Sequence, residues 1–227
     1  MKINVVKRVL NANDLVAQDN RKKFKQAQVL AVNFISSPGS GKTTLLEKTI
    51  QKLLPDEKSI ALVGDLQTTR DAERLAPGAL QATQINTGMS CHLYANQVAD
   101  ALKTLPLAKA DYLFIENVGN MVCPGEFDLG ENLKVVLLSI PEGDDKVAKY
   151  PTIFRAADLV LITKIDLMGA LSFDLKRIQD DLAKLNANVP LIQLSSLKGD
   201  GMVPWIQWLK AQRRKGIGAQ AKFVTEE

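Results

Sequence analysis

The sequence has little that would suit a membrane or secreted protein. It contains no run of eighteen uninterrupted apolar residues, so we expect no segment that crosses a bilayer. Its first residues, 1–7, are charged too early and apolar too briefly for a secretory signal, which predicts a cytoplasmic protein. The two cysteines among 227 residues are then expected to be thiols, because the cytoplasm is reducing.

Strong charge of one sign is also lacking. The formal net charge of +4 comes from basic residues that are interspersed with Asp and Glu along most of the chain. The only basic clusters are residues 21–23 and 213–215, and short clusters of this kind are ordinary on solvated helix faces. We therefore expect no nucleic acid among the partners.

Internal repeats and low-complexity linkers are absent as well, while a hydrophobic content of 46% is enough to bury a full core. Apolar runs of strand length alternate with segments of helical period, which is typical of a parallel sheet covered by helices on both faces. The expected strands are residues 29–35, 60–64, 83–86, 112–116, 135–140, 159–163 and 191–194. We interpret residues 1–28 as an N-terminal helical extension and residues 29–227 as one α/β domain.

The expected helix over residues 171–185 has an apolar face that would pack against the sheet. Its apolar residues recur at spacings of three and four: Leu171, Leu175, Ile178, Leu182 and Leu185. Ser172 is the predicted N-cap of this helix. In α/β sheets ligands bind at the carboxyl ends of the strands, so the residues that follow each strand are the candidates for function.

The segment after the first expected strand is rich in glycine. Residues 36–44, Ser-Ser-Pro-Gly-Ser-Gly-Lys-Thr-Thr, fit the pattern G-x-x-x-x-G-K-[ST], except that Ser36 replaces the first glycine. Backbone N–H groups and the next helix N-terminus are expected to surround the phosphates of a nucleotide. The predicted nucleotide-binding residues here are Gly39, Ser40, Gly41, Lys42, Thr43 and Thr44. Lys42 would reach the terminal phosphoryl oxygens, and Thr43 would bind Mg²⁺.

Two later segments indicate which base is bound. Residues 163–166, Thr-Lys-Ile-Asp, resemble the guanine-reading N-K-x-D motif of GTPases, with Thr163 in place of Asn. The Asp166 carboxylate would accept two hydrogen bonds from guanine, whereas adenine offers no such pair of donors. Lys164 would lie across the base, and the segment with Ser195 and Ser196 resembles the loop that contacts the guanine carbonyl. We predict GTP, which disfavours a P-loop small-molecule kinase.

Two acidic residues follow neighbouring strands. Asp65 and Glu116 stand where other GTPases sense the γ-phosphate, although ordinary solvated strand-end acids are the alternative interpretation. Two carboxylates there can hold Mg²⁺ and its waters, so Thr43, Asp65 and Glu116 are the predicted magnesium site. Lys42, Asp65 and Glu116 are the predicted catalytic residues, and residues 68–71 would be a switch ordered by GTP. Since no arginine finger or catalytic Gln is evident, we expect slow intrinsic hydrolysis.

The only histidine and both cysteines lie close to these segments. Cys91 and His92 come soon after the third expected strand, and Cys123 follows Glu116 closely. Thiolate and imidazole are ligands that suit Zn²⁺ and Ni²⁺. Three ligands are one short of a closed tetrahedron, so a water or a second subunit would complete the shell. The spacing alone leaves open that the cysteines are small buried hydrophobes.

Several stretches resemble a known family. They are residues 64–68, Gly-Asp-Leu-Gln-Thr; 86–93, Asn-Thr-Gly-Met-Ser-Cys-His-Leu; and 114–124, Phe-Ile-Glu-Asn-Val-Gly-Asn-Met-Val-Cys-Pro. With residues 127–130, 142–146, 149–151 and 205–209, they are similar to the hydrogenase nickel-incorporation GTPase family, HypB. The resemblance implies an α/β P-loop NTPase, a SIMIBI-like GTPase with a mostly parallel central sheet and helices on both faces.

The resemblance also implies a function for the cysteines and the histidine. Cys91, His92 and Cys123 would bind Ni²⁺ or Zn²⁺ at the interface of a homodimer promoted by GTP or metal. Hydrolysis of GTP to GDP would gate nickel transfer to a hydrogenase large-subunit precursor, with a small zinc-containing nickel-delivery protein as a further partner. The cysteine cluster or histidine-rich tract of many members is not in this sequence, so nickel storage is not expected. A urease-type or other metalloenzyme-maturation GTPase and a nucleotide-independent zinc-binding protein are the alternatives.

Overall fold

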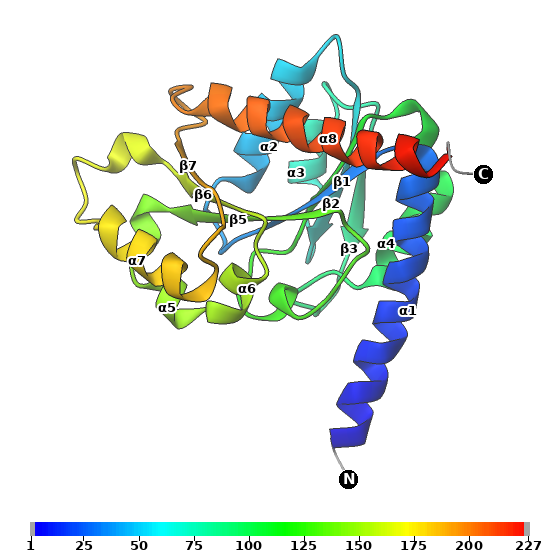
Figure 1. Ribbon diagram of the computed structural model, residues 1–227, viewed down its shortest axis with the longest axis horizontal. Helices are drawn as coiled ribbons and strands as arrows, with labels where there is room; N and C mark the ends of the chain where they lie inside the picture. Colours follow the sequence, from blue (N-terminus) through cyan, green and yellow to red (C-terminus); the bar gives the residue numbers. More distant parts are fainter. Residues whose placement is uncertain (1–2, 225–227) are drawn as a thin grey trace.

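The computed structural model, which describes residues 3–224, has a seven-stranded sheet at its centre (Figure 1). All neighbouring strands are parallel, in the order β3-β2-β4-β1-β5-β6-β7. The strands are β1 (Leu30–Ile35), β2 (Ser59–Asp65), β3 (Gln81–Asn86), β4 (Tyr112–Glu116), β5 (Leu133–Ser139), β6 (Leu159–Thr163) and β7 (Leu191–Leu194). The predicted strands are confirmed, with ends shifted by one or two residues at β1, β2, β3 and β5.

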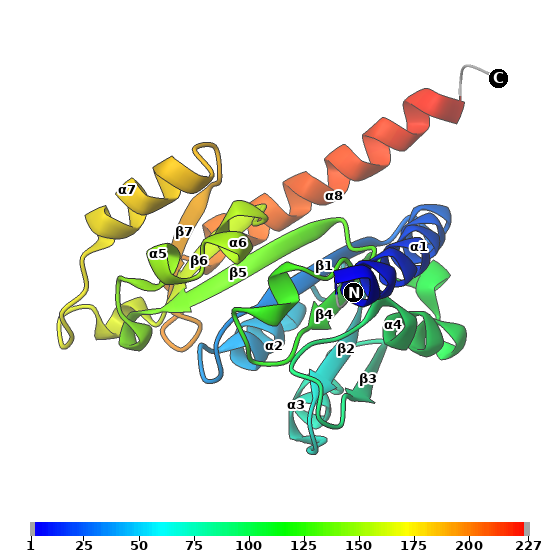
Figure 2. The same ribbon diagram turned by 90° about the horizontal axis from the view of Figure 1, so that it is seen from below.

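Helices cover both faces of the sheet (Figure 2). They are α1 (Ile3–Ala27), α2 (Lys42–Leu53), α3 (Arg70–Leu75), α4 (Ala95–Ala101), α5 (Lys146–Lys149), α6 (Pro151–Arg155), α7 (Leu175–Leu185) and α8 (Met202–Val224). Short 3₁₀ turns lie at Leu102–Thr104, Leu107–Lys109, Cys123–Gly125, Ile140–Glu142 and Ile165–Leu167. Buried residues of α2, α3 and α8 form the core on one face, and those of α1, α4, α5, α6 and α7 pack on the other. The described part of the chain contains no helix long and apolar enough to cross a membrane.

The central strands are buried on both faces, which explains their nearly continuous apolar sequences. In β1, Val32 and Phe34 face α2 and α8, whereas Ala31 faces the side of α1 and α4. Asn33 is the exception, because this amide side chain is fully buried in the middle of an apolar strand. Buried polar side chains are costly unless they are hydrogen-bonded, so its partners are described with the sites below.

Helix α1 forms most of the segment that we interpreted as an N-terminal extension. Its C-terminal half lies against the body of the protein, while its N-terminal half projects past it (Figure 1). Ala17, Asn20 and Phe24 on this helix have no exposed surface. Phe24 belongs to the core cluster that also contains residues of β1, β2, β4 and α4. The docked half of α1 is therefore part of the core.

The prediction that Ser172 caps the helix over residues 171–185 is wrong. Helix α7 begins at Leu175, and its N-cap is Asp174, whose carboxylate accepts a hydrogen bond from the Arg177 N–H at 3.2 Å. Leu171 belongs instead to the preceding turn, because its N–H donates to the Leu167 carbonyl at 3.2 Å. Asp is as good an N-cap as Ser, and Asp174 lies directly before the helix.

Candidate functional site

A pocket of about 530 Å³ lies where β1, β2 and β4 end. That volume is within the range of small-molecule sites. Eight of the predicted nucleotide or catalytic residues line it: Gly39, Gly41, Lys42, Thr43, Thr44, Asp65, Glu116 and Lys164. Four others, Ser40, Asp166, Ser195 and Ser196, are not among its lining residues. The fold thus brings the phosphate loop and both strand-end acids to one place.

The phosphate loop connects β1 to α2 through two glycines in left-handed conformation. Gly39 has φ +76° and Gly41 has φ +93°, values that strain any residue with a Cβ. The Lys42 ammonium donates to the Ser36 hydroxyl at 2.9 Å. Burial lowers the pKa of Lys42, while nearby carboxylates such as Glu116 oppose that shift. Ser36, the departure from the glycine pattern, therefore supplies an acceptor for the lysine.

The acid at the end of β4 lies against the start of α2. The Thr43 hydroxyl donates to one Glu116 carboxylate oxygen at 2.7 Å. The other oxygen, Oε2, is buried with no hydrogen-bond partner among the described residues. Burial raises the pKa of Glu116 to about 7, although Lys42 and Thr43 oppose the shift. A hydroxyl beside a buried carboxylate oxygen without a donor fits Mg²⁺, which takes oxygen ligands and neutralises such a charge.

The acid at the end of β2 has local partners. The Asp65 carboxylate accepts hydrogen bonds from the Gln67 N–H at 3.1 Å and the Thr68 hydroxyl at 3.0 Å. It therefore shapes the turn that leads into α3, over the segment predicted to be a switch. Asp65 lines the pocket together with Glu116, so the two predicted magnesium acids face the same space.

Sequence reasoning missed Arg74 of the pocket wall and included Asp71 only as the last residue of the predicted switch. Asp71 and Arg74, one turn apart on α3, both line the pocket. The Arg74 guanidinium donates to the Thr44 hydroxyl at 3.0 Å and to the Glu47 carboxylate at 2.8 Å. Arg74 follows Asp71 by three residues, and that spacing directly after the predicted switch was the available signal.

The first half of the predicted base-reading segment contacts the phosphate loop. The Thr163 hydroxyl donates to the Ser40 carbonyl at 2.8 Å, and both residues are buried. Thr163, which replaces the Asn of the motif, therefore fixes the loop from the neighbouring strand β6. Lys164 follows in left-handed conformation, φ +59°, and lines the pocket.

The second half of that segment lies further out. Asp166 is exposed in the 3₁₀ turn after β6, at the position where a base-reading carboxylate would be open to a ligand. Ser195 is fully buried, and its hydroxyl accepts from the Lys198 N–H at 3.1 Å. Ser196 is half-buried in the same loop. The Ser195 side chain thus stabilises the loop, and its backbone N–H donates to the Asp200 carbonyl at 2.9 Å.

Cys91, His92 and Cys123 lie together. One ligand atom from each of them falls within 4.8 Å of the other two. The two sulfurs are 2.9 Å apart, both cysteines are free thiols, and the His92 Nδ1 is 3.7 Å from the Cys91 sulfur. Two thiols and one imidazole within this radius are a donor set that fits Ni²⁺ or Zn²⁺. The prediction that the fold brings these three side chains together is confirmed.

Aromatic rings hold the histidine in place. The His92 ring stacks on Phe127 with centroids 4.0 Å apart and meets the edge of Tyr94 at 4.3 Å. Burial lowers the pKa of His92, so the neutral imidazole that a metal requires is favoured. The hydrogen bond with Cys91, together with burial, raises the pKa of the Cys123 thiol. A bound cation would oppose that effect, because metals are ligated by the thiolate.

The nucleotide pocket and the three soft ligands are joined at the end of β4. Glu116 faces α2, where it meets Thr43, whereas the next residue, Asn117, faces the opposite side of the sheet. The Asn117 side-chain oxygen accepts a hydrogen bond from the Leu93 N–H at 3.1 Å. Leu93 directly follows His92, so consecutive residues of one strand end contact the two sites.

Sequence comparisons place this geometry in context. A family model described as CobW/HypB/UreG, nucleotide-binding domain, matches residues 30–193. The "Hydrogenase/urease maturation factor HypB" of Helicobacter hepaticus is 45% identical over 225 residues, which cover 97% of this chain and 92% of that protein.

Two solved structures are similar over most of their length. The structure of HypB from Helicobacter pylori in complex with nickel is 41% identical with a TM-score of 0.86, covering 90% of this chain and 96% of that one. The hydrogenase maturation factor HypB from Archaeoglobus fulgidus is 39% identical with a TM-score of 0.84, covering 90% of this chain and 100% of that one.

Proposed function

The chain belongs to the HypB group of the CobW/HypB/UreG family, and from this we propose that it is a GTP-hydrolysing metallochaperone that gates nickel insertion into a [NiFe]-hydrogenase large subunit. One observation carries the proposal. Cys91, His92 and Cys123 converge within 4.8 Å on two segments that begin at strands of the nucleotide-binding sheet. A metal site in that position can respond to the nucleotide.

The nucleotide half of the proposal assigns roles to the pocket residues. Lys42 would leave Ser36 for the terminal phosphate of GTP, while Thr43 and Glu116 would hold Mg²⁺ with Asp65 nearby. The ion would neutralise charge on the phosphates. Lys164 and Asp166 would bind guanine, with Ser195 and Ser196 in the loop beside it.

Turnover is proposed to be slow. The pocket wall contains no glutamine among the described residues, and Arg74, the arginine that lines it, is already bound to Thr44 and Glu47. Hydrolysis then depends on strand-end carboxylates to orient water, without the stabilisation that an arginine finger adds. The protein would act as a timer of metal transfer.

The metal half treats Ni²⁺ as cargo. Three protein ligands leave the shell incomplete, so a second copy of the chain or a water would supply the rest, and a site of this kind exchanges its metal readily. We propose a homodimer promoted by GTP or metal, with Zn²⁺ as the competing ion. A zinc-containing nickel-delivery protein and the hydrogenase large-subunit precursor are the proposed partners, in the cytoplasm, where thiols stay reduced.

Urease is the second candidate target. The Helicobacter hepaticus relative carries both hydrogenase and urease in its description, and it matches 97% of this chain. The pocket and the three soft ligands would serve either enzyme in the same way, so only the receiving protein differs.

The first test measures the coupling directly. Ni²⁺ and Zn²⁺ are titrated into the full chain bound to GDP and to a non-hydrolysable GTP analogue, with the oligomeric state recorded by light scattering. We expect metal affinity or stoichiometry to differ between the two nucleotide states, since a ligand shifts an equilibrium only through differential affinity. Cys91→Ser should abolish the difference. Equal metal binding in both states would contradict the proposal, and preference for an ATP analogue would contradict the choice of base.

A further inference from the structure

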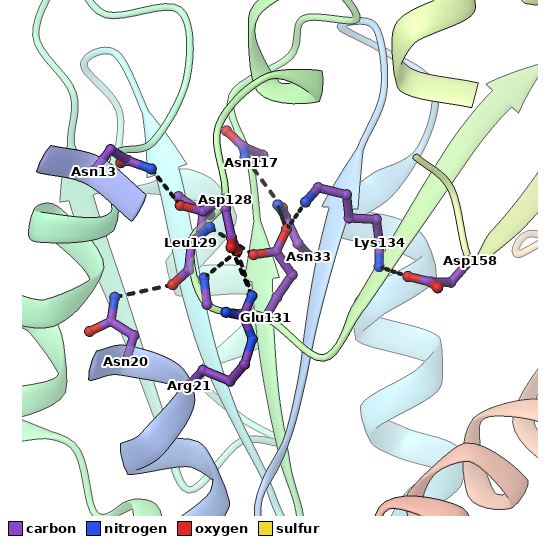
Figure 3. Close-up of polar contacts among 11 residues, drawn as sticks. Asn13, Asn20, Arg21, Asn33, Asn117, Asp128, Leu129, Glu131, Lys134 and Asp158 are labelled. Carbon is purple, nitrogen blue, oxygen red and sulfur yellow. Dashed lines mark hydrogen bonds and ion pairs between the residues drawn. The ribbon is translucent and has the colours of Figure 1, made fainter. Parts of the chain in front are cut away.

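Two loops carry the soft ligands, and helix α1 hydrogen-bonds to both of them. Figure 3 shows its contacts with the loop that contains Asp128 and Leu129. We define the first metal arm as residues 87–95, which contains Cys91 and His92, and the second metal arm as residues 120–131, which contains Cys123. The arms come from different strands, β3 and β4, and are far apart in sequence. Their approach therefore needs support from outside the arms.

Two asparagines of α1 bridge the arms. The Asn13 side chain accepts from the Ala95 N–H at 2.9 Å and donates to the Asp128 carbonyl at 2.7 Å. Asn20 donates to the Ala95 carbonyl at 2.9 Å and to the Leu129 carbonyl at 3.1 Å. Both side chains are buried, at 7% and 0% exposure. Seven residues separate them, which is two helical turns, so they grip the same two arms from one face of α1.

The helix is seated against the second arm at close range. Gly130 has φ +89°, and a Cβ on it would lie 2.4 Å from the Ala17 carbonyl oxygen of α1. Only glycine fits that contact without a shift of backbone. The Arg21 guanidinium adds two hydrogen bonds to the Asp128 carboxylate, at 2.9 and 2.8 Å. The hydrogen bonds of Asn13 and Asn20 are thus part of a close-packed contact.

The sheet holds the arms from the other side. Asn117 accepts from the Leu93 N–H of the first arm, and Glu131 accepts from the Leu129 N–H at 2.7 Å. Asn33 of β1 links these two side chains: it donates to Glu131 at 3.1 Å and accepts from Asn117 at 3.3 Å. Figure 3 shows the part of this chain of contacts that joins Asn117, Asn33, Glu131 and Leu129.

Polar side chains in these positions carry a cost that apolar ones would avoid. Hydrogen bonds reduce that cost, and such networks fix one arrangement of the groups that they join. The Asn20 side-chain nitrogen is hydrogen-bonded to both arms, whereas its oxygen is buried without a partner among the described residues. Here they satisfy backbone groups of both arms, whose two sulfurs lie 2.9 Å apart. Binding to a preformed site costs less ordering, which raises affinity.

We propose that Asn13 and Asn20 are positioning residues for the metal site: they hold the two arms at the separation where Cys91, His92 and Cys123 can share one Ni²⁺ or Zn²⁺ ion. The inference rests on the proposed function only in taking these three residues as the metal ligands. It assigns to α1 a role in metal affinity that is separate from nucleotide binding.

The test uses the full chain and the variants Asn20→Leu and Asn13→Leu, which keep side-chain size but remove the hydrogen bonds. Ni²⁺ alone is the probe, followed by competition with a chelator and by the thiolate-to-nickel charge-transfer absorption. We expect the dissociation constant for Ni²⁺ to rise about tenfold, the lower end of the effect of outer-shell changes at metal sites. The charge-transfer band should shift, while GDP affinity stays within twofold of the parent protein.

Phe24→Leu is the matched control, because it weakens the packing of the same helix by loss of volume and removes no arm hydrogen bond. It should leave the Ni²⁺ band and affinity unchanged. Unchanged Ni²⁺ affinity in both asparagine variants would overturn the inference. So would an equal loss in Phe24→Leu, or loss of GDP affinity in both variants, since each indicates a merely structural role. A parent protein that binds no Ni²⁺, or that binds it equally as Cys91→Ser, would instead contradict the proposed function.

Discussion

The nucleotide pocket and the metal arms are built in opposite ways. The phosphate loop is one contiguous segment with two glycines in left-handed conformation, and its Ser40 is held from a later strand and a later turn by the side chains of Thr163 and Glu142. The metal arms are two segments from different strands, held by side chains that lie outside them, such as Asn20 and Asn117. A contiguous loop depends on few distant residues, whereas the metal arms depend on several.

Both regions nevertheless use buried polar groups. In the pocket these groups, Lys42 and Glu116, are ionisable and face a space where a ligand fits. Around the arms the buried polar groups are mostly amide side chains that contact backbone. At Asn33 and Asn117 both the side-chain nitrogen and the side-chain oxygen have hydrogen-bond partners within the protein. The first arrangement is suited to binding and the second to holding shape.

The largest expected effect is on GTP hydrolysis, in a variant of the nucleotide pocket that should leave the metal arms unaffected. Lys42→Ala removes the charged donor of the phosphate loop, and loss of one such preorganised donor costs roughly 100-fold to 1,000-fold in rate. We expect single-turnover GTP hydrolysis to fall by about that factor. Ni²⁺ affinity without nucleotide should stay within twofold of the parent protein. A parallel fall in Ni²⁺ affinity would show that the regions cannot be separated.

The next largest effect is on Ni²⁺ affinity, in a variant of the metal arms that should leave the nucleotide pocket unaffected. Cys123→Ser replaces a soft thiolate by a hydroxyl, which is a poor ligand for Ni²⁺. We expect a loss of about 100-fold in Ni²⁺ affinity, since even outer-shell changes cost 10-fold to 100-fold. GDP affinity, measured by calorimetry, should not change. Val122→Ala, at the exposed neighbour, is the control and should bind Ni²⁺ normally.

A smaller effect concerns the support of the arms. Asn33→Leu removes one hydrogen bond from Glu131 and leaves the buried Asn117 side-chain N–H without its partner, which should lower the free energy of unfolding by about 1–3 kcal/mol in urea titration. Asn117→Leu interrupts the same chain of contacts. The double variant should therefore cost less than the sum of the single ones, and strict additivity would contradict a shared network.

The smallest effect lies at the surface of the α1 contact. Burial raises the pKa of Asp128, but hydrogen bonds from Arg21 and from the Gly130 N–H outweigh this and hold the pKa below its ordinary value. A lowered folded pKa gives stability that is present above the unfolded value, about 3.9, and lost as pH falls through the folded value. Because the pair is partly exposed, Arg21→Gln should lower Tm by only about 1–2 °C at pH 7. The difference should shrink as pH falls below about 3.9, and a difference that stays constant down to full protonation of Asp128 would exclude this ion pair as its cause.

Local patterns in the sequence were enough for the strands and the phosphate loop. Strand β1 and the loop after it are consecutive, and an apolar run followed by Gly-Lys-Thr has few other structural solutions. The departures at Ser36 and Thr163 could be seen but not explained. Their partners, the Lys42 ammonium and the Ser40 carbonyl, become neighbours of these hydroxyls only when the loop closes against the sheet.

The supports of the arms could not be predicted in the same way. Asn20 contacts residues 75 and 109 positions away, and an asparagine in a polar helix is ordinarily a surface residue. The available signal was its place in a stripe with Ala17 and Phe24, which are both buried. The N-cap of α7 could not be predicted for a related reason. Several polar residues precede this helix, and the backbone conformation decides that Asp174 is the one that caps it.

The alternation of side chains along β4 gives the protein one more property. Glu116 and Asn117 face opposite sides of the sheet because successive residues of a strand do so. A slip of one residue in the pairing of β4 with β1 would carry the carboxylate toward the sulfurs and the amide toward the phosphates. Phosphate chemistry and thiol chemistry are therefore kept apart by the hydrogen-bond register of a single strand.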